Sequence, residues 1–128
     1  MAVFLFFSVL LFSQTLSWYG NYDKAHQTAL KQGKPLLVLV VKAKDPSSRN
    51  VIRQVLMDQP YISKLKEKVI AVMVTYEREE SYPVEMYYTT IFPALFLVDS
   101  STELFLQKAL YGEEITPETL KKYLQKLP

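Results

Sequence analysis

A short polar segment, Asp45-Pro46-Ser47-Ser48, carries the first residues whose types permit chemistry. A serine such as Ser48 becomes a nucleophile when a base lies within hydrogen-bonding reach of its hydroxyl group. The only histidine, His26, falls on a separate helical stretch, and nothing in the sequence brings it to Ser48. A lone histidine at the margin of a helix is usually a boundary residue. We therefore expect no catalytic residues and no enzymatic activity.

The chain contains no cysteine. The chain therefore cannot attack through a thiolate or exchange disulfides, and it cannot bind a metal through thiolate ligands. With one histidine in the sequence, a zinc site would need mostly carboxylates, which form a poor zinc ligand set. We expect no metal and no cofactor, and a fold that its core holds together without disulfides.

Asp45 followed by Pro46 is the pattern of a helix N-cap with proline at the first helical position. A missing amide donor costs nothing at that position, and the carboxylate would lie at the positive end of the helix. We therefore expect Asp45 to stabilise the folded chain as a cap.

The stretch before Pro93 is unusually aromatic for a connection between two elements. One interpretation is a helix packed on the sheet, with its tyrosine hydroxyls reaching water, and this is the one we favour. The other is a surface that binds a partner, because tyrosine and methionine are enriched at interfaces. The residues concerned are Tyr82, Met86, Tyr87 and Tyr88.

Hydrophobic periodicity predicts helices and buried strands in the first half of the chain. Residues 21–32 have a helical pattern between a capping Asn21 and Gly33. Leu36–Val41 is a continuous β-branched run typical of a central strand, and Val69–Val74 repeats that pattern. The helical spacing between the two runs predicts a right-handed parallel crossover.

The second half predicts a hairpin and a final helix. Ala94–Val98 forms a third strand, a turn follows, and Glu103–Leu110 forms a fourth, antiparallel strand. The last helix begins with Thr116 as N-cap and Pro117 at its first position. The sequence thus predicts an α/β fold with a mixed four-stranded sheet flanked by helices.

This order of elements resembles the thioredoxin fold, a three-layer sandwich, over about residues 18 to 127. More specifically, the chain resembles exported thioredoxin-like domains related to the C-terminal part of thiol:disulfide interchange proteins. The segments that carry it include Trp18, Gly33-Lys34-Pro35-Leu36-Leu37, the loop at 42–49 and Phe92–Asp99.

The resemblance implies where a redox site would lie. The two cysteines of the family would fall on Asp45 and Ser48, with Pro46 and Ser47 between them. Pro93 would be the family's cis-proline, and the residues before it, Ile91 and Phe92, would edge a groove for an extended peptide. Whether Phe92 faces that groove or the core stays open.

Composition and the N-terminus bear on partners and location. The formal net charge is +2 with both signs interleaved, so no basic face favours nucleic acid. Residues 1–17 are largely apolar and resemble a signal peptide that is cut before Trp18, which leaves 18–128 as one domain. An uncleaved membrane anchor is the alternative. Either outcome predicts an exported chain, periplasmic or secreted.

These observations predict a redox-inactive exported protein that binds a peptide or partner protein through the groove. A chaperone-like or accessory role in the cell envelope follows from that interpretation. Two alternatives remain: a structural subunit of an envelope complex, and an enzyme with chemistry that needs no thiol.

Overall fold

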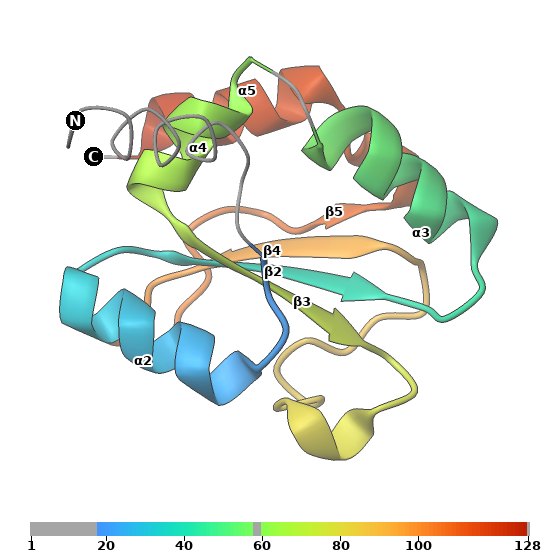
Figure 1. Ribbon diagram of the computed structural model, residues 1–128, viewed down its shortest axis with the longest axis horizontal. Coiled ribbons are helices and arrows are strands. Elements are labelled where there is room, and N and C mark those ends of the chain that lie inside the picture. The colour runs from blue at the N-terminus through green and yellow to red at the C-terminus, as the bar shows by residue number, and fades with distance from the viewer. Residues whose placement is uncertain (1–17, 58–59, 128) are drawn as a thin grey trace, which may run out of the picture.

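The computed structural model describes residues 18–57 and 60–127 (Figure 1). The predicted signal peptide, residues 1–17, lies outside them. The elements in chain order are β1 (Trp18–Tyr19), α2 (Tyr22–Gln32), β2 (Leu36–Val41), α3 (Pro46–Val51), the π-helical η2 (Ile52–Leu56), α4 (Ile62–Lys68), β3 (Ile70–Thr75), the short η3 (Glu79–Ser81), β4 (Ala94–Val98), β5 (Leu110–Tyr111), the short η4 (Gly112–Glu114) and α5 (Pro117–Lys126).

The sheet has the strand order β1-β3-β2-β4-β5. Strands β1, β3 and β2 are parallel, whereas β4 is antiparallel to β2 and β5 is antiparallel to β4. Val38 in the middle of β2 pairs with Val72 on one side and Phe96 on the other. All six residues of β2 are buried, which confirms the predicted central strand.

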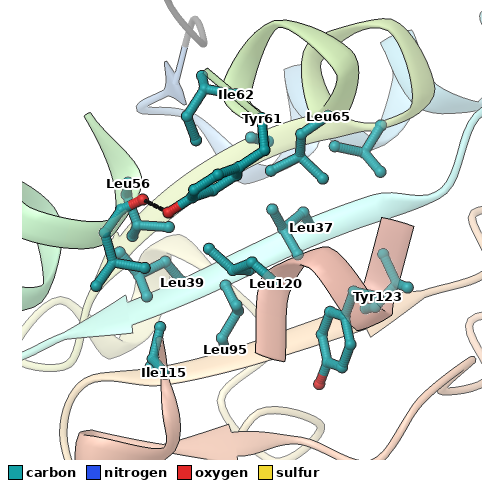
Figure 2. Packing of buried hydrophobic residues seen from close by; sticks show 14 of the residues in the cluster. Leu37, Leu39, Leu56, Tyr61, Ile62, Leu65, Leu95, Ile115, Leu120 and Tyr123 are labelled. Atoms are coloured by element: carbon teal, nitrogen blue, oxygen red, sulfur yellow. Dashed lines mark hydrogen bonds between the residues drawn. The ribbon is translucent and has the colours of Figure 1, made fainter. Parts of the chain in front are cut away.

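Helices cover both faces of the sheet and make three layers (Figure 1). On one face, Leu37, Leu39 and Leu95 pack beneath α3, α4 and α5. Figure 2 shows this core, in which the Tyr61 hydroxyl donates to the Val55 carbonyl oxygen. On the other face, alternate residues of the same strands pack against α2. The alternation explains why β2 is apolar throughout.

The predicted helix boundaries rest on local signals that the structure confirms. The Asn21 side chain accepts a hydrogen bond from the Lys24 amide at the start of α2, and Gly33 ends that helix at a φ of 63°. Thr116 caps α5, and Pro117 is its first residue. These signals act within one turn of backbone, so the sequence reveals them directly.

The sheet has five strands, so the predicted number of four is wrong. The additional strand, β1, is two residues long and pairs with Ala71 and Val72 at the sheet edge. Two residues are too few to show the alternating hydrophobic pattern of a strand in the sequence. Only the pairing with β3 identifies this segment as a strand.

The fourth predicted strand, Glu103–Leu110, is also wrong in its bounds. Within those bounds Phe105 forms an isolated bridge to Val98, and only Leu110 belongs to a regular strand, the two-residue β5. The Asp99 carboxylate holds the preceding turn by accepting from the amide and hydroxyl of Thr102. The chain then passes through Glu103 at a φ of 60°, which interrupts a regular strand.

Candidate functional site

Asp45 is the N-cap of α3, as predicted. One of its carboxylate oxygens, Oδ2, lies 3.0 Å from the Ser48 amide nitrogen and 2.8 Å from the Ser48 hydroxyl, and both groups donate to it. Pro46 takes the first helical position. The hydrogen bonds from Ser48, its hydroxyl foremost, lower the pKa of Asp45 below its usual range.

The Ser48 hydroxyl is held inside this cap. Ser48 is 3% exposed, and its oxygen also accepts from the Lys42 amide at 3.4 Å. The histidine lies elsewhere: His26 Nε2 is 2.8 Å from the Ser100 carbonyl oxygen and 3.6 Å from Glu103 Oε1. Ser48 and His26 therefore do not form a nucleophile and base pair in this arrangement.

Replacing Asp45 with alanine is expected to lower the melting temperature by a few degrees, whereas Asp45→Asn is expected to keep most of the stability. Asparagine still accepts from the Ser48 amide, and alanine cannot. Thermal unfolding followed by circular dichroism measures the difference. Equal losses in the two variants would contradict the capping role.

The same cap predicts a dependence on pH. The pKa of Asp45 is lower in the folded chain than in the unfolded chain, so its contribution is full above the unfolded value of about 3.9. That contribution is lost as the pH falls through the folded value. Asp45→Asn should therefore lose less stability than the wild type on acidification below about pH 4, in urea titrations at each pH. Parallel losses would contradict this prediction.

Across from the cap lies the loop that leads into β4. The Phe92–Pro93 peptide bond is cis, as predicted from the resemblance. The hydroxyl of Thr89, a buried residue, donates to the Ile91 carbonyl oxygen at 2.7 Å and accepts from the Ile91 amide at 3.1 Å. Both backbone groups of Ile91 are thus satisfied within the loop, and its side chain remains 56% exposed.

Phe92 takes part in both environments that the sequence left open. It is half-buried, its ring centre lies 5.0 Å from that of Tyr76, and the Lys42 ammonium lies 5.7 Å above the ring. It packs against the core on the α2 face and also lines the groove described next.

A groove of about 570 Å³ separates the α3 wall from the cis-proline loop and η4. Its floor and edges include Ser47, Val51, Val55, Ile91, Phe92 and Ile115. The structure thus brings together three of the predicted residues, one from the Asp45 loop and two from the loop before β4. Pro46 instead lines an adjoining hollow, and neither Asp45 nor Ser48 lines the groove.

Gly112 is a groove residue that sequence reasoning missed. It adopts a φ of 54°, and its amide donates to the Pro93 carbonyl oxygen at 2.8 Å. A Cβ at this position would lie 3.4 Å from Cγ2 of Ile91. The chain has only three glycines. A glycine between two polar and aromatic stretches could have indicated that two backbones approach each other closely at this position.

The tyrosine-rich segment forms no helix between Tyr82 and Tyr88, so the favoured interpretation is wrong about the helix. Tyr82 and Tyr87 are nevertheless buried against the sheet. The Tyr87 hydroxyl lies 2.7 Å from that of Tyr22, and burial raises the pKa of Tyr87 far above its usual range. Met86 is half-buried, and Tyr88, 66% exposed, is the outward-facing member of the segment.

Tyr88 borders a second, smaller hollow. This hollow of about 220 Å³ is lined by Tyr88, Thr89, Thr90, Ile91 and Tyr111. It shares Ile91 with the main groove, so one exposed side chain lies between the two.

Two further properties concern the described residues alone. Within residues 18–57 and 60–127, His, Asp and Glu side chains do not gather in groups of three or more that could hold a metal ion. Over the same residues, no helix combines the length and the apolar character of a membrane span.

No family model and no curated relative matches the sequence. Among solved structures, a thioredoxin from Thermus thermophilus has a TM-score of 0.71 and 20% identity, over 88% of this chain and 86% of that one. The oxidoreductase DsbH gives 0.72 and 16%, over 87% and 83%. The C-terminal domain of Neisseria meningitidis DsbD in the oxidised form gives 0.62 and 18%, over 85% and 98%.

At such low identity, these similarities show the fold and leave the activity to be argued from the site. The sheet order, the covering helices and the cis-proline loop agree with that assignment. The described part of this chain therefore has a thioredoxin-like fold, in a sequence that lacks the cysteines of a redox pair.

Proposed function

We propose that this chain is an exported, redox-inactive thioredoxin-like protein that binds an extended segment of a partner protein. The observation that carries the proposal is the groove between α3 and the cis-proline loop, with Ile91 exposed at its edge. An apolar side chain that its own loop exposes to water is unfavourable in the free protein. Its burial by a partner lowers the free energy of the complex. A partner segment that covers Ile91 explains that arrangement.

The loop also suggests how the main chain of a partner would bind. Thr89 satisfies both backbone groups of Ile91. The backbone groups of Phe92 have no hydrogen-bond partner within the described residues. An extended segment can pair with such groups as an added strand, and apolar pockets beside it then select its side chains. The expected complex is therefore a short β-like pairing at Phe92.

Export is part of the proposal and is supported by the sequence of residues 1–17. An apolar stretch followed by Thr15 and Ser17, which are small, is the pattern of a cleavable signal peptide. A chain without cysteine in an oxidising compartment would bind clients without exchanging disulfides with them. An accessory or chaperone-like role in the cell envelope fits both features.

A photo-reactive residue in place of Ser47, compared with one in place of Lys122, tests the proposed groove in the native host. Ser47 lines the groove, and Lys122 is exposed on α5, away from it. We expect a defined partner to be captured from Ser47 and not from Lys122. Capture from neither position, or equally from both, would count against the groove.

A structural subunit is the second candidate, and one observation favours it. Leu104, Phe105 and Leu106 are consecutive and are exposed by 67%, 51% and 42%. Exposed apolar side chains at a sheet edge are a common site of permanent contact. Capture of a partner from Gln107 but not from Ser47 would favour this function over the first.

A further inference from the structure

One side of the groove adjoins a hollow lined by two arginines and the other side carries a glutamate. This arrangement of charge refines the proposed function on which it rests. We infer that the groove selects partner segments that carry a carboxylate close to an apolar side chain. The apolar side chain occupies the floor of the groove, and the carboxylate binds the arginines that α3 and η2 present beside it.

The α3 side is positively charged. Arg49 on α3 and Arg53 on the adjoining η2 stand one helical turn apart and line a hollow of about 500 Å³ together with Pro46. Ser47 and Asn50 line both this hollow and the groove, so the two adjoin. We expect a long arginine side chain to reach a carboxylate bound at that shared edge.

Neither arginine forms an ion pair within residues 18–57 and 60–127. Both side chains are exposed. A guanidinium group binds a carboxylate through two parallel hydrogen bonds, which makes it more selective than an ammonium group. The two free guanidinium groups thus favour a partner that brings acidic side chains.

The opposite wall is negatively charged. Glu113 lines the groove, and Glu114 and Glu118 are each next in sequence to a residue that lines it. The Glu114 carboxylate accepts from the Tyr111 amide at 2.9 Å, which holds it against its own segment. An acidic partner residue is therefore repelled from this wall and directed toward α3, so the charges also set the orientation of the bound segment.

The floor between the walls is apolar. It is formed by the buried Val51, Val55 and Ile115, and the exposed Ile91 from the cis-proline loop extends this apolar surface at the edge of the groove. Such a floor can bind a side chain of the size of leucine or phenylalanine, and it does not require that side chain to form a hydrogen bond. Charge on the walls, and not the floor, then discriminates among apolar segments.

Selection from a phage-displayed library of random decapeptides tests this inference. The wild type should enrich decapeptides in which aspartate or glutamate lies near an apolar residue. The double variant Arg49→Glu/Arg53→Glu should lose that enrichment and bind the selected peptides about tenfold more weakly, in fluorescence anisotropy at low salt. The matched control, Lys122→Glu/Lys126→Glu, makes the same charge change at the same spacing on α5 and should leave both results unchanged.

The groove itself is checked by Ile91→Asp, which places a charge on its apolar edge and should abolish selection altogether. If wild-type peptides are apolar without acidic enrichment, and Ile91→Asp removes them, the charge inference is overturned and the proposed groove stands. If Arg49→Glu/Arg53→Glu and the control weaken binding equally, the inference is overturned as well. If Ile91→Asp leaves selection intact, the groove is not the binding site and both proposals fail.

Discussion

Replacing Asp45 and Ser48 together by cysteine is expected to produce a reversible disulfide in a chain that has no thiol. The two side chains already converge, because the Ser48 hydroxyl lies 2.8 Å from an Asp45 carboxylate oxygen. Residues three positions apart at the start of a helix also have the Cα separation that a disulfide requires. The loop geometry thus suits a redox pair.

The roles of the two introduced thiols follow from their exposure. Position 45 is half-buried at the positive end of α3, which lowers the pKa of a thiol there, whereas position 48 is 3% exposed. The thiolate at 45 would attack a substrate disulfide, and the thiol at 48 would then displace the substrate as a thiol and close the protein disulfide. The wild type has no thiol and cannot start this cycle, so any thiol-dependent disulfide reductase activity of the variant is new.

Thiol titration before and after treatment with oxidised glutathione measures the disulfide, and reduction of insulin by dithiothreitol measures turnover. Asp45→Cys alone is the control, because it can form a mixed disulfide with glutathione and cannot close an internal one. If both thiols of the double variant stay free under oxidising conditions, the prediction is contradicted. In that case the geometry of this loop does not support a redox pair.

The largest expected loss of stability is that of Tyr87→Ala. Tyr87 is fully buried, its ring packs edge-on against Tyr22 and Phe96, and its hydroxyl meets that of Tyr22. Truncation of a buried aromatic residue costs about 3–5 kcal/mol. Because small domains are stable by only about 5–15 kcal/mol, much of the variant is expected to unfold under mild denaturation.

Two substitutions separate the causes of that loss in urea titrations. Tyr87→Phe keeps the ring and leaves the Tyr22 hydroxyl without its partner, which is expected to cost about 1–3 kcal/mol. Tyr88→Ala changes a neighbouring tyrosine that is 66% exposed, and its expected effect lies within about 0.5 kcal/mol. Similar losses for Tyr88→Ala and Tyr87→Ala would show that the segment is not anchored by Tyr87.

Local signals in the sequence predicted the elements that hold the site. The Asp45 cap depends on atoms three residues apart, and the burial of β2 follows from an unbroken run of apolar residues. Only about 5–6% of bonds before proline are cis in folded proteins, so the residues around Pro93 do not by themselves predict a cis bond. That prediction came from the resemblance to a family.

Long-range contacts decided the features that the sequence left open or that were predicted wrongly. Strand β1 exists because β3 offers it an edge, and the Tyr82–Tyr88 segment is anchored through Tyr22, which is 65 positions away from Tyr87. The helical interpretation of that segment considered its local composition alone, and packing against α2 provided a stronger interaction.

The sequence alone establishes the absence of cysteine, because that is a matter of composition. It also establishes the caps and the central strands, because these depend on residues that are close together in the chain. The groove is different, because it joins Ser47, Ile91 and Gly112 from three separate segments. The charges on its two sides arise in the same way, since Arg49 follows β2 and Glu113 follows β5, and these segments reach the same edge only when β4 pairs with both β2 and β5. Chain topology sets which distant residues meet, and the tertiary structure was therefore needed to define the binding site.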